Sequence, residues 1–248
     1  MSEQEWTPDE IMTIVAARQF RNNSKCFVGV GAPSMAACLA RLLHAPDIVL
    51  IYESGTIGAK PTTAPLSIAD SELAETANVV VPVTEFFSHW LQGGRIDMTF
   101  LGTAQIDRFG NLNTTVTGQY ARPKVRLPGA GGAPEAARLS KDVVVITKQT
   151  QRTFVEKVDF ITTVTRKNLS AVVTDMGVLK PDPETGELVL VASYPGVAVE
   201  DVQERSGWPL RIAEDIEESV GPTASELATL RYLESETRRA HEYESRFP

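Results

Sequence analysis

The chain has 248 residues, a formal net charge of −8 and 42% hydrophobic residues, which is ordinary for a globular protein that buries a core. The acidic balance argues against nucleic acid as the main partner, because phosphate binding needs a basic surface. No apolar stretch approaches the roughly 18–20 residues of a membrane span. Residues 1–6 are polar and lack the apolar core of a signal peptide. We therefore expect a cytoplasmic protein that contacts no membrane.

The cysteines and histidines predict neither a disulfide framework nor a metal site. Cys26 and Cys38 are too few for a framework and lack CxxC spacing, so we expect buried thiols. His44, His89 and His241 are scattered along the chain, and no HExxH or Cys/His cluster appears. We expect structural or surface roles for all three histidines and no metal.

The first half of the chain alternates between predicted helices and strands. Thr7, Pro8 and Glu10 carry the signature of a capping box with proline in the first turn, so a helix begins there. Helical spacing also predicts helices over residues 34–43, 71–77 and 84–92. Short apolar runs predict strands over residues 25–30, 47–52, 79–83 and 98–101.

The second half continues with apolar runs and ends in a long helix. The runs cover residues 143–147, 154–163 and 171–174, a turn over 181–186 joins two strands, and the helix covers 222–243. Alternating strands and helices predict an α/β fold. Because the strands are continuous apolar runs, we expect an open, mainly parallel sheet with helices on both faces. Without repeats or a long linker, residues 1–248 are expected to form a single domain.

The tripeptide Glu53-Ser54-Gly55 follows the second predicted strand directly. Open α/β sheets bind ligands at the carboxyl ends of their strands, so Glu53 is a candidate catalytic carboxylate. Gly55 allows a sharp turn and the close approach of a substrate, with Ser54 beside it. The tripeptide alone favours the alternative, a glutamate in a solvated turn.

A glycine-rich segment, residues 129–133, follows Pro128. Its backbone N–H groups can all point at one anion, such as a phosphate or a developing oxyanion. No Gly-Lys-Ser/Thr follows, so the segment is not a Walker A motif. The candidate anion-binding residues are Gly129, Gly131, Gly132 and Ala133. An ordinary exposed loop is the alternative.

Two polar segments lie near this loop in the sequence. Gln105, Asn111 and Asn113 follow a predicted strand, where they can orient a substrate or simply form turns. The basic residues Arg122, Lys124 and Arg126 alternate along an extended segment before the loop, where they can meet phosphates or line a solvated strand face.

Together, these motifs resemble the β subunit of class I (family I) CoA transferases over nearly the whole chain. The segments that carry the resemblance are residues 28–33, 45–47, 53–55, 105–113, 124–133 and 173–177. The glutaconate and 3-oxoadipate branches are most similar. Residues 51–61 and 91–97 especially resemble the 3-oxoadipate transferase of aromatic degradation.

The resemblance implies a CoA transferase fold and a transfer of CoA between an acyl-CoA and a carboxylic acid. Glu53 matches the family's nucleophile, which forms a glutamyl-CoA thioester. It also implies a coenzyme A thioester as substrate without a tightly bound cofactor, succinyl-CoA and a dicarboxylic acid such as 3-oxoadipate as the reaction pair, and an α subunit as partner, paired into α2β2. The oxyanion donors implied are the N–H groups of Gly131 or Gly132.

The sequence departs from the family pattern where a longer, glycine-rich loop is usual. Only residues 165–170 separate two runs here, so the loop is shortened or residues are missing from the sequence. Whether a lid or a substrate contact comes from this place is therefore left open by the resemblance. Two competing functions remain: an acyl-CoA hydrolase or decarboxylase on the same fold, and a non-catalytic ligand-binding regulatory domain. The presence of Glu53 beside a complete glycine loop favours the transferase.

Overall fold

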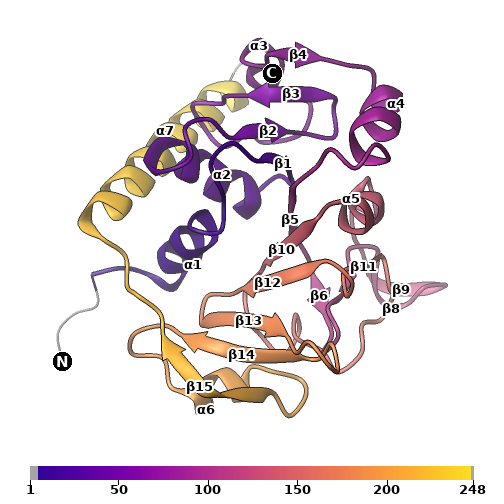
Figure 1. Ribbon diagram of the computed structural model, residues 1–248, viewed down its shortest axis with the longest axis vertical. Helices are drawn as coiled ribbons and strands as arrows, with labels where there is room; N and C mark the ends of the chain where they lie inside the picture. The colour runs from indigo at the N-terminus through magenta and orange to yellow at the C-terminus, as the bar shows by residue number, and fades with distance from the viewer. Residues whose placement is uncertain (1–4, 247–248) are drawn as a thin grey trace. The chain divides into compact units, whose positions relative to one another are not determined.

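The computed structural model describes residues 5–246, with side chains described as far as residue 242. Contacts divide the chain into two compact units, Met1–Phe100 with Pro222–Pro248 and Leu101–Gly221 (Figure 1). The second unit is an insertion in the first, because the chain leaves the first unit once and returns to it. The expectation that the whole chain behaves as a single domain stays a prediction.

Three helices of the first unit pack against one another: α1 (Pro8–Ala17), α2 (Ala32–Leu43) and α7 (Ala224–Arg246). The predicted capping box begins α1, with the Thr7 side chain accepting a hydrogen bond from the Glu10 N–H and the Thr7 N–H donating to Glu10 Oε2 at 2.7 Å. In α2 the helix begins earlier than predicted, since Pro33 fits its first turn.

The sheet of the first unit has a parallel centre and an antiparallel edge. Strand β1 (Lys25–Val28) pairs in parallel with β2 (Val49–Ile51) and β5 (Met98–Gly102). Antiparallel β3 (Thr56–Ala59) and β4 (Val79–Val80) follow beyond β2. This arrangement places the carboxyl ends of β1 and β2 at the same edge of the sheet.

Three more predicted elements of the first unit differ in length from the structure. The strand expected over 79–83 ends at Val80, because Pro82 lacks a backbone N–H for a ladder. The helix expected over 84–92 is α4 (Val83–Glu85) continued by the π-helix η1 (Phe86–Leu91). The short helix α3 (Ser71–Glu75) ends two residues before its predicted end.

The main sheet of the second unit also mixes parallel and antiparallel pairs. Strand β10 (Asp142–Ile146) is parallel to β12 (Leu169–Val173), and β14 (Leu188–Ser193) is parallel to β15 (Arg211–Glu218). Strand β13 (Gly177–Pro181) joins the two pairs in antiparallel fashion. The predicted α/β class is therefore confirmed, with the parallel pairs linked by antiparallel hairpins.

Short elements complete the second unit. They are the strands β6 (Gln105–Ile106), β7 (Asn111–Asn113), β8 (Val116–Gln119), β9 (Arg122–Arg126) and β11 (Thr163–Val164), and the helices α5 (Ala133–Leu139) and α6 (Val199–Glu204). Strands β6, β7 and β11 form one small sheet, while β8 and β9 form a separate hairpin.

The strand predicted over 154–163 is mostly wrong. Only Phe154, in an isolated bridge with Ile106, and Thr163, at the start of β11, take part in strand pairing. Between them the chain turns so that the Asp159 carboxylate accepts hydrogen bonds from the Gly118 N–H and from the side chain of Gln105. Polar contacts therefore replace the expected ladder.

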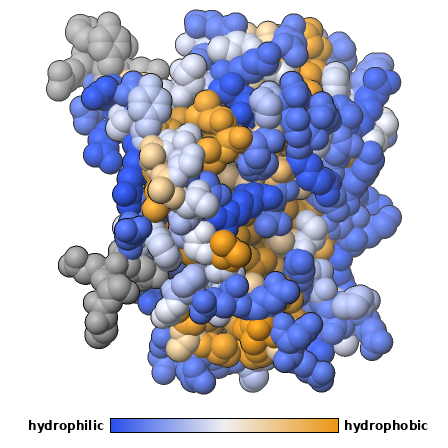
Figure 2. Space-filling model, turned by 60° about the vertical axis from the view of Figure 1, so that its left-hand side comes forward, coloured by the Kyte–Doolittle hydropathy of each residue, from blue (hydrophilic) through white to orange (hydrophobic). Residues whose placement is uncertain are grey.

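Polar residues cover most of the face shown in Figure 2, with smaller apolar patches between them. Within residues 5–246, no helix is both long and apolar enough to cross a bilayer. The predicted burial of Cys26 and Cys38 is confirmed, and burial raises the pKa of each thiol to about 12. Both cysteines are therefore protonated and unreactive at neutral pH.

The first testable prediction concerns the docking of α7. Arg18 donates to both carboxylate oxygens of Glu226, at 2.8 and 2.7 Å, and the Thr223 N–H donates to the same carboxylate at 2.8 Å. Burial alone would raise the pKa of Glu226, but the hydrogen bonds from Arg18 and Thr223 outweigh it and lower this pKa to about 2.

A depressed pKa in the folded state stabilises the protein above the unfolded-state value and loses that contribution as the pH falls. We expect Glu226→Gln to lower the Tm at pH 7 and the difference from wild type to narrow as the pH falls from about 4.5 towards 2. Calorimetry at steps from pH 7 to about 3 measures this difference. A difference that does not change with pH would contradict the assignment.

Candidate active site

Glu53 lies in the turn of the hairpin that joins β2 to β3. The Gly55 N–H donates to the Tyr52 carbonyl oxygen at 3.0 Å, and the Tyr52 N–H donates to the Thr56 carbonyl oxygen at 3.1 Å. These bonds close a three-residue loop in which Gly55, at φ +91°, occupies the bulge position. Glu53 therefore lies two residues after the carboxyl end of β2, close to its predicted place, although its role stays a prediction.

Gly55 is required at this position for two reasons. A positive φ strains any residue with a Cβ atom. In addition, a Cβ at Gly55 would lie 2.0 Å from the Val81 carbonyl oxygen. The Val81 N–H donates to the Gly55 carbonyl at 3.0 Å, so the segment after β4 rests on the turn. The hydrogen bonds within the turn and the contact with Val81 together restrict the backbone around Glu53.

The residues next to Glu53 anchor the turn and leave its carboxylate half-buried. Tyr52 is fully buried, and burial raises the pKa of its phenol. Ser54 is half-buried, with its hydroxyl oxygen 3.5 Å from Thr56 Oγ1. Buried Tyr52 and half-buried Ser54 thus flank a half-buried Glu53.

The loop that leaves β1 lies at the same sheet edge as Glu53. Phe27 is opposite Ile51 in the parallel pair, so Gly29 and Glu53 each come two residues beyond the paired positions. Ser34, in the first turn of α2, donates to the Gly29 carbonyl oxygen at 2.9 Å. The sheet edge therefore combines a carboxylate with the start of a helix, which is where α/β sheets bind ligands.

The glycine loop belongs to the second unit, whereas Glu53 belongs to the first. Gly129 and Gly131 both have positive φ, +105° and +49°. The Ala133 N–H donates to the Ala130 carbonyl oxygen at 3.1 Å, and α5 begins at Ala133. Among the described residues, no hydrogen-bond acceptor contacts the N–H groups of Gly131 and Gly132. Gly131 is exposed whereas Gly132 is buried, so the N–H of Gly131 is the more accessible of these two donors.

The predicted substrate-proximal residues Gln105 and Asn113 lie opposite each other in the pair of strands β6 and β7. Asn113 is fully buried, and its Nδ2 donates to Gln105 Oε1 at 2.7 Å. Asn111 instead donates to Asp107 Oδ2 at 2.9 Å. These amides all bond to protein groups, so the contacts support a role in shaping the site more than a direct role in holding substrate.

Sequence reasoning missed three residues that connect this region to the loop. Thr114 bonds to Gly129, Thr162 bonds to Thr114, and Asp159 bonds to Gln105. The hydroxyl-rich run after Asn113 was the available signal for Thr114. Nothing in the local sequence marks the other two.

The basic residues of β9 lie on an exposed hairpin. Arg122, Lys124 and Arg126 are exposed, and the Arg126 guanidinium lies over the Tyr120 ring at 5.0 Å from its centroid. The predicted extended segment is confirmed. Its contact with phosphates stays a prediction, and a solvated strand face remains the alternative.

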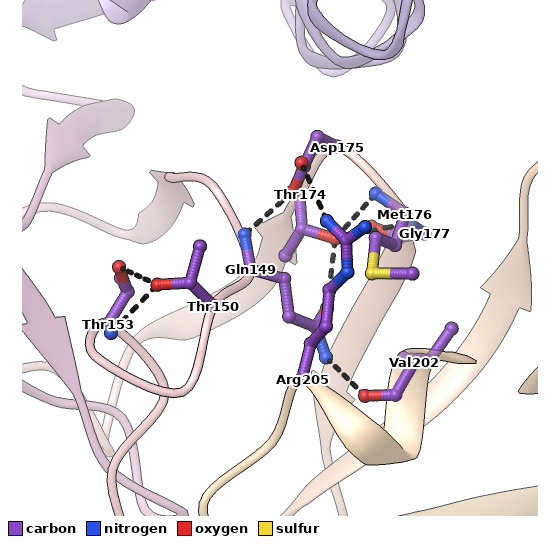
Figure 3. Close-up of polar contacts among 9 residues, drawn as sticks. All are labelled: Gln149, Thr150, Thr153, Thr174, Asp175, Met176, Gly177, Val202 and Arg205. Atoms are coloured by element: carbon purple, nitrogen blue, oxygen red, sulfur yellow. Dashed lines mark hydrogen bonds and ion pairs between the residues drawn. The ribbon is translucent and has the colours of Figure 1, made fainter. Parts of the chain in front are cut away.

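Residues 173–177 form the turn between β12 and β13 (Figure 3). Thr174 Oγ1 accepts hydrogen bonds from the N–H groups of Met176 and Gly177, both at 3.1 Å. Asp175 Oδ1 accepts from the Gln149 N–H at 2.7 Å. Gln149 is itself fully buried, with its side chain bonded to the Val202 carbonyl. This family motif therefore holds a turn together.

The connection from β11 to β12 is a tight turn. The N–H groups of Asn168 and Leu169 both donate to the Thr165 carbonyl oxygen, at 2.9 Å. Thr165 Oγ1 donates to the Gly110 carbonyl oxygen at 2.7 Å. A closed turn thus occupies the place where the family pattern has a longer loop.

The histidines are separated from one another and contact the backbone or solvent. His44 Nε2 lies 3.1 Å from the Phe20 carbonyl oxygen, and His241 Nε2 lies 3.1 Å from the Ala64 carbonyl oxygen. His89 is exposed. Within the described part of the chain, no group of three or more His, Cys, Asp or Glu side chains is placed to hold a metal ion.

Comparison with known proteins identifies the family. The model of the family described as Coenzyme A transferase matches residues 10–205. The β subunit of the 3-oxoadipate CoA-transferase of Pseudomonas knackmussii is 54% identical over 250 residues, which cover 95% of this chain and 96% of the relative. The chain therefore belongs to the coenzyme A transferase family, and within it to the β-subunit type.

Solved structures confirm the fold. The glutaconate coenzyme A-transferase of Acidaminococcus fermentans superposes with a TM-score of 0.84 at 30% identity, covering 92% of this chain and 94% of the other. The decarboxylase AibA/AibB superposes with a TM-score of 0.81 at 25% identity, covering 91% and 93%. The predicted CoA transferase fold and family are confirmed. Because the matched relatives are enzymes, a catalytic role is favoured over the competing prediction of a non-catalytic regulatory domain.

The second testable prediction concerns Gly55. We expect Gly55→Ala to lower the Tm more than Gly94→Ala, although both glycines have positive φ, because nothing lies within 4 Å of a Cβ at Gly94. Positive φ alone costs about 1–2 kcal/mol, or roughly 2–8 °C in a chain of this size. The clash with Val81 adds to this cost only at Gly55.

Thermal unfolding of the two variants, side by side, measures the difference. Equal losses would show that the turn tolerates a displaced Val81, and the proposed restraint on the Glu53 backbone would then be wrong.

Proposed function

We propose that this chain is the catalytic β subunit of a heteromeric CoA transferase, with Glu53 as the nucleophile. The observation that carries the proposal is a half-buried glutamate in a glycine-closed turn, two residues after a parallel strand. The relatives with the same fold and high identity support the transferase reaction.

The first half of the reaction moves CoA onto the enzyme. A Glu53 oxygen attacks the thioester carbonyl of the donor, and the carbon–sulfur bond breaks to give an acyl–glutamyl anhydride and CoA thiolate. The thiolate then attacks the glutamyl carbonyl and releases the donor acid as a carboxylate. Glu53 is left as a CoA thioester, which is covalent catalysis through an activated intermediate.

The second half reverses these steps with a different acid. The acceptor carboxylate attacks the Glu53 thioester, thiolate leaves, and the resulting anhydride is opened by thiolate at the acceptor's carbonyl. Glu53 returns as a carboxylate and a new acyl-CoA departs. One thioester replaces another, so no external energy source is needed.

Each step passes through a tetrahedral oxyanion that needs hydrogen-bond donors. The N–H groups of Gly131 and Gly132 have no acceptor among the described residues, so they suit this role. One such donor is typically worth about 3–4 kcal/mol in the transition state. Water must be excluded as well, because it would hydrolyse the anhydride.

The proposed partner is a CoA transferase α subunit, in an α2β2 assembly in the cytoplasm. The most informative support is the Pseudomonas relative, itself named as one subunit of its enzyme, which this chain matches along almost its full length. The same name supports 3-oxoadipate as the acid that exchanges CoA. Succinyl-CoA as the CoA donor, and coenzyme A as a substrate thioester and not a bound cofactor, are part of the proposal through the family resemblance. The basic side chains of β9 are candidates for contact with CoA phosphates.

An acyl-CoA decarboxylase or hydrolase is the second candidate, because the decarboxylase AibA/AibB shares the fold. Neither reaction requires CoA to be attached covalently to the enzyme. The presence of Glu53 in the glycine-closed turn favours the transferase, and a covalent Glu53–CoA species would separate the two.

The third testable prediction is made for the complex with the α subunit. Glu53→Gln should lower CoA exchange between succinyl-CoA and 3-oxoadipate by at least about 1,000-fold, because removing a nucleophile abolishes the covalent route. Glu75→Gln removes an equal charge from an exposed position on α3 and should stay within about twofold of wild type.

Steady-state rates at several concentrations of both substrates provide the measurement. The wild type should give parallel double-reciprocal lines, the pattern of a ping-pong reaction. Intersecting lines, together with an active Glu53→Gln variant, would contradict the proposal.

A further inference from the structure

We propose that Thr114 is a positioning residue that fixes the glycine loop for catalysis, a role that rests on the function proposed above. The Gly129 N–H donates to the Thr114 carbonyl oxygen at 2.8 Å, and Thr114 Oγ1 donates to the Gly129 carbonyl oxygen at 2.7 Å. Thr114 therefore holds the peptide groups on both sides of the first glycine of the loop. We call this pair of hydrogen bonds the Thr114 clamp.

Hydrogen bonds, and not close packing, fix the backbone at Gly129. No atom lies within 4 Å of the place where a Cβ of Gly129 would be. Glycine also has the largest conformational freedom of any residue, so a loop with three glycines is costly to order. The Thr114 clamp supplies the restraint that side chains would provide elsewhere.

Thr114 is itself held by a second layer of polar contacts. Its N–H donates to Thr162 Oγ1 at 3.0 Å, and Thr162 Oγ1 lies 2.7 Å from Thr115 Oγ1. The Thr115 N–H donates to Asn113 Oδ1 at 3.0 Å. Hydrogen bonds therefore connect the clamp to Asn113 of β7 and to Thr162 in the segment before β11.

The network ends at a carboxylate. Asn113 Nδ2 donates to Gln105 Oε1 at 2.7 Å, and Gln105 Nε2 donates to Asp159 Oδ2 at 3.1 Å. The Gly118 N–H donates to the same Asp159 oxygen at 2.8 Å. Hydrogen bonds to a charged acceptor are stronger than neutral ones, so Asp159 stabilises the base of the network.

This arrangement has a kinetic consequence. Oxyanion donors act only when they lie close to the position of the developing charge, so small shifts of the loop weaken them in the transition state. Binding of the substrate ground state depends much less on this placement. Loss of the clamp should therefore lower kcat and leave KM almost unchanged.

The test compares three variants in the complex with the α subunit. Thr114→Val removes the hydroxyl but keeps the shape of the side chain, and Thr114→Ser restores the hydroxyl. Thr117→Val is the matched control, since Thr117 lies on β8 and no hydrogen bond from its hydroxyl is found within the described chain. The rates are divided by the fraction of subunits that form the Glu53–CoA thioester, so that misfolded protein is not counted.

We expect Thr114→Val to lower the corrected kcat about 5- to 10-fold, the effect of one hydrogen bond, with KM within about twofold of wild type. Thr114→Ser and Thr117→Val should keep kcat within about twofold. A wild-type kcat in Thr114→Val, or a raised KM at unchanged kcat, would overturn the proposal. If the wild-type complex shows no CoA exchange, the proposed transferase function is contradicted, and the role of Thr114 is contradicted as well.

Discussion

The position of Glu53, the proposed nucleophile, depends on a backbone contact in which only glycine fits. The Val81 N–H bonds to the Gly55 carbonyl, and the Val81 carbonyl occupies the space that a Cβ of Gly55 would need. Because this contact closes the β2–β3 turn, Glu53 follows the buried Tyr52 with little freedom of its backbone. In the proposed mechanism, this fixed backbone lowers the entropy lost when the carboxylate is oriented for attack, and such positioning contributes to rate enhancement.

The glycine loop is restrained in a different way from the Glu53 turn, by hydrogen bonds and not by close packing. In the proposed mechanism its N–H groups must be accessible to a bound group and must also stay in place. The structure meets both needs by leaving Gly131 exposed and fixing the loop where it begins, at Gly129. Preorganised donors of this kind stabilise charge without moving during the reaction. The proposed chemistry thus combines a fixed nucleophile with a loop that is anchored through buried polar residues.

Features that depend on neighbouring residues could be predicted from the sequence. The capping box of Thr7 and Glu10, the alternation of strands and helices, and the place of Glu53 after an apolar strand are all of this kind. The family followed from motifs spread over the chain, and the matched relatives confirm it.

Features that depend on distant partners could not be predicted. The run before β11 resembles a strand, but Asp159 within it accepts a hydrogen bond from Gln105, which lies 54 residues away in the sequence. The amides of Gln105 and Asn113 resemble substrate ligands until their partners are known. The division into two units likewise depends on contacts that no local pattern encodes.

The central claim is that Glu53 carries CoA as a thioester. Mass spectrometry of the α/β complex, after incubation with succinyl-CoA and then borohydride, tests it directly. Borohydride reduces a glutamyl thioester to an alcohol, so the peptide that contains Glu53 should lose about 14 Da. Thr114→Val should still form this species, since the clamp affects rate and not the identity of the nucleophile. An unmodified Glu53 in a complex that still consumes succinyl-CoA would contradict the account and favour a hydrolase or decarboxylase.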